Sequence, residues 1–287
     1  QNPKTPKIKI ANNKNMKEPN PIQAVEQEQG ESGVAKLTKF IEQAATMYRN
    51  DGIPVRSDGR IDIQSYASLY SDTRSDAEKI REWETKWFGD ISETQKLEKR
   101  RQMEGEQLEM LSYAIFMKNL GDEFVVVRSS SHDDRVNKVD TLILDRKTGT
   151  IVCAFDEVGA TSGAEYENKL KSVRDHNLNG GASLKYGICP KTENGKQTVA
   201  LSPAENIPVF YIALSSGYTK RGMKEFLPDM EKQSDFEKNL FDYFLATINI
   251  QIGELESSGQ RLNPALRNKL MSFKQIMESR KEKKLKK

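Results

Sequence analysis

Residues 139–158 read VDTLILDRKTGTIVCAFDEV, two β-type runs on either side of a short polar turn. The runs at 139–145 and 150–158 are rich in apolar and β-branched residues, as β-strands are. The turn at 146–149 ends in a glycine, the residue that tight hairpin turns favour at positions of special backbone geometry. We therefore expect two antiparallel strands joined as a hairpin.

Further elements follow on both sides of this hairpin. Helical spacing and β-type runs predict a helix that begins after Gly105 and stops at Gly121, a strand over 124–128, a helix over 164–175 and strands over 183–189 and 207–214. Tight loops link the first three strands, and a helical crossover leads to the strand at 183–189. The resulting order, αβββαβ, predicts an α/β fold with a mixed central sheet and helices on its faces.

Composition divides the chain into four parts. Residues 1–32 are rich in Pro, Asn and Lys with almost no apolar periodicity, which predicts a disordered basic arm. Helical patterns predict a helical N-terminal region over 33–104 and C-terminal helices with a basic tail over 219–287, the last helix opening at Pro264. The α/β core is expected between them, over 105–218.

The charge of the chain is concentrated at its ends. The formal net charge is +3, yet residues 1–21 and 278–287 each carry +4, which leaves a net −5 for the residues between them. Basic ends suit contact with nucleic acid, because each neutralised phosphate releases a counterion. The alternative is that the lysines simply keep the ends solvated.

Several classes of protein are excluded by composition. No apolar run approaches the ~18–20 residues of a membrane span, and the first residues lack the apolar centre of a secretory signal. Cys153 and Cys189 are too few for a disulfide scaffold, so we expect buried free thiols and a cytoplasmic protein. With two histidines, a metal would be held mainly by carboxylates, which favours Mg²⁺ or Mn²⁺.

Three acidic residues stand where the folding of an apolar strand does not explain them. Asp140 interrupts one run of the hairpin, Asp156 lies near the end of the other, and Glu109 belongs to the preceding helix. Burying a lone carboxylate is costly, so each needs a partner, a metal or an open edge of the sheet. The hairpin can bring Asp140 and Asp156 together, and a divalent cation would relieve their repulsion. The alternative is that strand-end acids simply meet water.

This layout resembles the PD-(D/E)xK nuclease superfamily, with a spacing similar to archaeal Holliday-junction resolvases and related restriction-type endonucleases. The resemblance covers roughly residues 105–190 and rests on Gly105-x3-Glu109, Gly121, the strand at 124–128 with Ser129 and Ser130, Asp140, and Ala154-Phe155-Asp156. It implies a restriction-endonuclease-like αβββαβ core that hydrolyses DNA or RNA phosphodiesters with magnesium. By position it implies that Glu109, Asp140 and Asp156 are the metal-ligating acids.

The lysine of that motif is missing. The family lysine falls two residues after the second acid, where this chain has Val158, or Gly159 if the element is counted from Glu157. Some members of the superfamily carry the lysine on a neighbouring element. The candidates here are Lys169 and Lys171 on the following helix and Lys185 on the next predicted strand. We favour Lys185 as the catalytic cation, because strand alternation could turn it toward the acids.

Two functions follow from these observations. The first is a metal-dependent nuclease that cuts DNA, or RNA, with the basic ends adding affinity. The second is a catalytically inactive nuclease-like module that binds nucleic acid or a protein partner. An unrelated α/β enzyme also stays open, as do the choice between DNA and RNA and a homodimeric state.

Two other features are assigned to structure first. The segment 129–134, SSSHDD, predicts a polar loop between strands that could contact phosphate or a metal. Trp83 and Trp87 lie at helical spacing with apolar neighbours, which predicts core packing in preference to a base-stacking platform.

Overall fold

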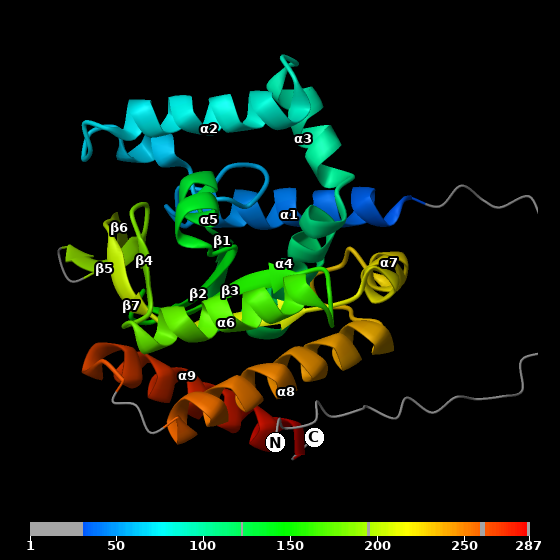
Figure 1. Cartoon of the computed structure of the whole chain (residues 1–287), viewed down its shortest axis with the longest axis vertical. Helices are drawn as coiled ribbons and strands as arrows, with labels where there is room; N and C mark the ends of the chain where they lie inside the picture. The colour runs from blue at the N-terminus through cyan, green and yellow to red at the C-terminus, as the bar shows by residue number, and fades with distance from the viewer. Residues whose placement is uncertain (1–30, 122, 194–195, 259–261, 286–287) are drawn as a thin grey trace, which may run out of the picture. The chain divides into compact units, whose positions relative to one another are not determined.

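A four-stranded mixed sheet lies at the centre of the fold (Figure 1). The computed structural model describes residues 31–121, 123–193, 196–258 and 262–285, so nearly all of the predicted arm at 1–32 lies outside the described residues. The strands, in the order β1-β2-β3-β8, are β1 (Phe124–Arg128), β2 (Thr141–Asp145), β3 (Ile151–Val158) and β8 (Val209–Ala213). β1, β2 and β3 are antiparallel, and β8 is parallel to β3. The α/β class with a mixed sheet is confirmed.

The hairpin between β2 and β3 forms where it is expected. The Asp145 carboxylate accepts hydrogen bonds from the backbone N–H groups of Lys147 and Thr148, both at 2.8 Å. Gly149 takes a φ of +65°, in the left-handed region that glycine occupies without strain. An aspartate that caps its own turn and a glycine at the turn's end together set the register of the two strands.

The fourth strand of the sheet is not the one predicted from sequence. The segment 183–189 does not join the sheet, because β4 (Ala182–Leu184) pairs with β7 (Ala204–Ile207) and β5 (Ile188–Glu193) pairs with β6 (Lys196–Leu201). β8, which lies within the strand predicted over 207–214, pairs with β3 instead. Its sequence VFYIA is continuously apolar, as a parallel strand buried on both faces requires, whereas 183–189 is interrupted by polar residues and glycine.

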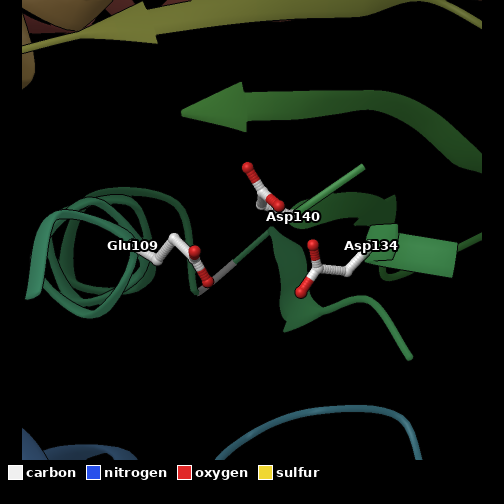
Figure 2. A group of neighbouring side chains, drawn as sticks. All are labelled: Glu109, Asp134 and Asp140. Atoms are coloured by element: carbon white, nitrogen blue, oxygen red, sulfur yellow. The ribbon is translucent and has the colours of Figure 1, made fainter. Parts of the chain in front are cut away.

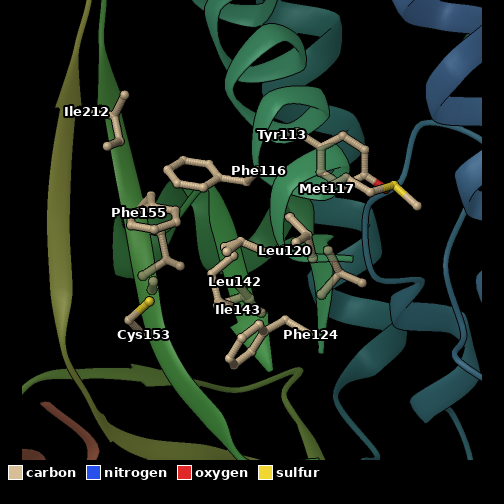
Figure 3. Close-up of a cluster of buried hydrophobic side chains, with 14 of the residues drawn as sticks. Tyr113, Phe116, Met117, Leu120, Phe124, Leu142, Ile143, Cys153, Phe155 and Ile212 are labelled. Carbon is tan, nitrogen blue, oxygen red and sulfur yellow. The ribbon is translucent and has the colours of Figure 1, made fainter. Parts of the chain in front are cut away.

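Helix α4 (Glu104–Leu120) is buried around most of its circumference and packs on the sheet. Figure 3 shows Phe116 pointing from α4 toward Phe155 of β3, and their rings stack with centroids 4.4 Å apart. Burying a side chain of this kind stabilises the fold by about 1.5–3 kcal/mol. The same helix carries Glu109, so core packing fixes where that carboxylate lies.

The two faces of the sheet are covered by different helices. α4 lies on one face, and Phe273 of α9 (Pro264–Leu285) stacks on Phe210 of β8 on that same face. On the other face α6 (Ala164–Leu178) brings Tyr166 into an edge contact with Tyr211. α6 crosses in front of the strands in Figure 1. The crossover helix thus approaches Asp156 from the side opposite α4.

Helices from both ends of the described chain complete the core. They are α1 (Gly33–Asn50), the 3-10 turn η1 (Ile63–Tyr66), α2 (Thr73–Phe88), α3 (Glu93–Arg101), α7 (Ser216–Glu225) and α8 (Asp235–Ser257). One hydrophobic cluster includes residues of α1, α4, α8 and the sheet. The division at 104 and 218 stays a prediction, and α7 begins at Ser216. Among the described helices, none is long and apolar enough to cross a membrane.

The segment predicted as a polar loop contains a helix, which corrects a second expectation. α5 (Ser131–Asn137) begins directly after β1 and is capped by Ser130, whose hydroxyl accepts a hydrogen bond from the Asp133 N–H at 3.0 Å. The pattern Ser-x-x-Asp at 130–133 is an N-terminal capping signal, which explains why a polar stretch becomes helical here. The helix places Asp134 beside the strand ends.

Candidate metal site

Asp140 lies at the point where β2 and β3 meet. Its backbone N–H donates to the Phe155 carbonyl at 2.9 Å, which sets Asp140 beside the acids that follow Phe155. Its Oδ2 accepts a hydrogen bond from the Glu157 N–H at 2.8 Å. Burial raises the pKa of both Asp156 and Glu157, and hydrogen bonding with the Asp140 carboxyl opposes this rise in both. The sequence therefore correctly predicts that Asp140 and Asp156 come together.

The side chains of the two acids of β3 point to opposite faces of the sheet, because successive side chains on a strand alternate. Glu157 faces α4, where its Oε1 accepts hydrogen bonds from Ser112 at 2.7 Å and Thr141 at 3.1 Å. Asp156 faces α6, where its Oδ1 forms an ion pair with the Lys169 ammonium group. Asp140 lies between them at the strand ends.

Lys169, and not Lys185, is the lysine that reaches the acids. Lys185 forms ion pairs with Asp72 and Asp76 of the α2 region. Lys171 is exposed on α6. Lys169 lies about two and a half turns before the C-terminal end of α6, on the face that packs against β3. One of the two helix lysines considered from sequence is thus brought to the site, and the favoured strand lysine is not.

Glu109 is held by two arginines. Its Oε2 accepts from the Arg60 guanidinium at 2.7 Å and from the Arg128 guanidinium at 2.6 Å. Both arginines also contact the buried Glu106, one turn earlier on α4, at 3.4 and 2.6 Å. Because both contacts to Glu109 use Oε2, Oε1 is not committed to either arginine.

Arg60 reaches this position because its loop is attached to the end of β1. The Ile61 N–H donates to the Arg128 carbonyl at 3.0 Å, and the Arg128 N–H donates to the Gly59 carbonyl at 3.1 Å. Gly59 has a φ of +77°, so the turn relies on a residue without a side chain. The other guanidinium nitrogen of Arg60 donates to Asp134 at 2.8 Å.

Three carboxylates converge around Asp140. One oxygen from each of Glu109, Asp134 and Asp140 lies within 4.8 Å of the other two. Figure 2 shows Glu109 approaching from α4 and Asp134 from α5, with Asp140 between them. The set expected from sequence is Glu109, Asp140 and Asp156. In the structure Asp134 is the third member in place of Asp156, and Asp156 lies next to the group, beside Asp140.

Burial and repulsion from neighbouring carboxylates raise the pKa of both Asp140 and Glu109. Burial raises the pKa of Asp140 well above its ordinary value, and the charge of Glu109 adds to the effect. Burial also raises the pKa of Glu109 to about 7, although Arg60 opposes it. Burial alone would lower the pKa of Lys169, but Asp156 and Asp140 raise it, so this lysine stays protonated. The cluster holds more negative groups than its cations neutralise, so it would bind either protons or a further cation.

The donor set fits a hard divalent cation. All the candidate ligand atoms are carboxylate oxygens, which Mg²⁺ and Mn²⁺ prefer. Oε2 of Glu157 is buried without a hydrogen-bond partner among the described residues, which is costly unless a ligand or a proton satisfies it. Glu109, Asp134 and Asp140 could therefore hold such an ion.

Sequence reasoning missed the two arginines of the site, Arg60 and Arg128. Arg128 ends the apolar strand FVVVR, and the argument used for strand-end acids applies equally to a strand-end arginine. Arg60 gives no such signal, since it lies 49 residues from Glu109 in a turn. Asp134 belongs to the segment 129–134, for which the sequence predicts a polar loop that could contact a metal, and helix α5 is what places it beside Asp140.

No protein-family model, curated protein or solved structure matches this chain. Function is therefore inferred from the side chains of the site.

Proposed function

We propose that this protein hydrolyses phosphodiester bonds in nucleic acid with a divalent cation held by the carboxylates around Asp140. The observation that carries the proposal is the Lys169 ammonium group on Asp156, at the same sheet end as Asp140. A half-buried lysine beside paired acids, with a raised pKa, is suited to a site where negative charge must be bound.

The acidic side chains and the lysine of the site would have different roles in the reaction. Glu109, Asp134 and Asp140 would hold Mg²⁺ or Mn²⁺, which when bound would polarise a phosphodiester and lower the pKa of water. Lys169 remains cationic and would stabilise the charge that develops on the phosphoryl oxygens in the transition state. Asp156 would orient that ammonium group by its ion pair.

The arrangement supports the resemblance to PD-(D/E)xK nucleases with two changes, the first of which is that Asp134 groups with Glu109 and Asp140 in place of Asp156. The helix acid, the acid before the second strand and the acid on the third strand occupy the order that the resemblance implies. The motif lysine at the position of Val158 is replaced by Lys169, which approaches Asp156 from α6. We propose Lys169 in this role in place of Lys185.

The test is cleavage of plasmid DNA, branched DNA and RNA with Mg²⁺ or Mn²⁺. We expect Asp140→Asn and Lys169→Met each to lower the rate by about 100-fold or more. Lys171→Met is the matched control, because Lys171 is an exposed lysine on the same helix, and this variant should cleave like the wild type. Wild-type protein that cleaves none of these substrates, or a Lys169→Met variant at full activity, would contradict the proposal.

A second candidate is a nuclease-like module that binds without cutting. The observation in its favour is that Arg60 and Arg128 already neutralise part of the carboxylate charge at Glu109. This candidate predicts that Asp140→Ala keeps nucleic-acid or protein binding and that added Mn²⁺ has no effect on it.

A further inference from the structure

Arg135 is held between two tryptophans beside the carboxylate site. Its guanidinium carbon lies 5.6 Å from the ring centre of Trp83 and 5.2 Å from that of Trp87. The two rings belong to consecutive turns of α2, which packs against α5. Arg135 follows Asp134 on α5, so this cluster adjoins the group of acids around Asp140.

Each acid near Arg135 is already paired with another arginine. Asp134 accepts from Arg60 at 2.8 Å, and Glu84 is paired with Arg100. Within the described part of the chain, Arg135 itself has aromatic contacts and no ion pair. Its planar guanidinium group therefore has N–H donors available for an anion, and guanidinium groups bind phosphate with two parallel hydrogen bonds.

Trp87 is exposed, which corrects the prediction that both tryptophans belong to the core. The Trp87 side chain is 63% exposed, whereas Trp83 is partly buried against the core. Trp87 is the most exposed of the large hydrophobic side chains in the described residues. An indole that is exposed on one side and supported by an arginine on the other presents a flat surface on which a nucleobase can stack.

We propose that Trp87 and Arg135 bind an unpaired nucleotide of the substrate, with its base on the Trp87 ring and its phosphate on the Arg135 guanidinium group. The proposal rests on the proposed function for the class of ligand, a nucleic acid. Because a base inside a duplex has no free face for an indole, the ligand is single-stranded or has an unpaired end or branch. The site would lead such a strand to the acids around Asp140, one of which, Asp134, directly precedes Arg135 on α5.

Binding is measured without metal, so that it is independent of cleavage. Single-stranded DNA and RNA oligonucleotides of about 10 nucleotides are titrated in EDTA, with a fluorescent label for affinity and tryptophan emission for contact. The chain has two tryptophans, both at this site, so quenching of their emission reports on it directly. We expect quenching in the wild type and weaker binding to a blunt duplex.

Two substitutions separate the two contacts. Trp87→Ala should weaken binding by about 5- to 150-fold, the range measured for loss of one stacked base, and Trp87→Tyr should restore part of it. Arg135→Gln should lower the slope of log affinity against log salt by about 0.7, as loss of one phosphate contact does, whereas Arg135→Lys should keep the slope. A merely structural role for Arg135 would leave that slope unchanged.

The matched control is Arg221→Gln in α7. Arg221 also lies over an aromatic ring, 4.5 Å from the centre of Phe236, but it is ion-paired with Glu225. This variant should bind like the wild type. Equal affinity and equal salt slope in Trp87→Ala, Arg135→Gln and wild type would overturn the inference, as would the absence of oligonucleotide binding. If cleavage with Mg²⁺ nevertheless occurs, the proposed function stands and this site alone is rejected.

Discussion

Glu109 shows how burial and ion pairing compete at a single residue. Its carboxylate accepts two arginine contacts, yet burial raises its pKa to about 7. Glu106, on the same helix, is more deeply buried, yet Arg128 and Arg60 hold its pKa below the ordinary value. The attraction of the arginines thus outweighs burial at Glu106 but not at Glu109. The Glu109 carboxylate can therefore accept a proton or a further cation.

The raised pKa of Glu109 predicts a pH-dependent stability. Between the ordinary value of 4.5 and the folded value of about 7, the folded protein keeps a proton that the unfolded chain has lost. The stabilisation that the protonated Glu109 adds to the free energy of unfolding is therefore present below pH 4.5 and is lost as the pH rises toward 7. In EDTA, urea unfolding should show the wild type losing stability over this window relative to Glu109→Gln.

Glu104 provides a control on the same helix. Its carboxylate is solvent-exposed, and hydrogen bonding to Lys220 lowers its pKa, so Glu104→Gln should not remove the loss seen in the wild type. Parallel curves for the wild type and Glu109→Gln from pH 4.5 to 7 would show that Glu109 titrates as an ordinary carboxyl.

Residue-level prediction from sequence worked where a residue breaks the pattern of its own element. Asp140 and Asp156 stand out because each interrupts or follows an apolar run. Lys169 and Arg60 do not, since lysines and arginines on helices and turns are ordinary surface residues. Their roles depend on packing between segments 13 and 49 residues apart, which no local pattern records.

At the scale of elements, the hairpin was predictable and the outer strand was not. The β2–β3 hairpin is encoded by local turn chemistry at Asp145 and Gly149. The parallel partner of β3 lies beyond two small hairpin-like pairings, β4 with β7 and β5 with β6. Because several short β-type runs follow α6, the sequence pattern alone does not say which one closes the sheet.

Substitution of two glycines by alanine would show how tightly these elements are packed. Gly181, before β4, has a φ of +90°, and a Cβ there would lie 2.7 Å from the Ile207 carbonyl oxygen. Gly253, within α8, has no atom within 4 Å of such a Cβ. Gly181→Ala should therefore lower the free energy of unfolding by more than about 1 kcal/mol, whereas Gly253→Ala should raise it by about 0.5–1 kcal/mol.

Urea denaturation of both variants measures these changes, and each serves as the control for the other. A Gly181→Ala variant as stable as the wild type would mean that the turn into β4 does not have the described backbone. A destabilised Gly253→Ala would mean that this part of α8 is packed against another element.

At the scale of the molecule, the site is assembled from parts that the sequence predicts as separate. Arg60 and Trp87 belong to the helical region at 33–104, whereas Asp140 and Lys169 belong to the α/β core. The fold class follows from patterns within the core, but the contribution of the N-terminal helices is visible only in three dimensions. The basic segment at 1–21 lies outside the described residues, so its predicted contact with nucleic acid stays a prediction.

The most direct test of the account is a calorimetric titration of Mn²⁺ into the folded protein and into Asp140→Asn. Asp145→Asn is the control, because Asp145 lies at the other end of the same strand and caps a turn. We predict saturable binding in the wild type and in Asp145→Asn, with protons released because Asp140 and Glu109 have raised pKa values, and loss of this binding in Asp140→Asn. Absence of binding in the wild type, or equal binding in Asp140→Asn, would contradict a cation site at this end of the sheet.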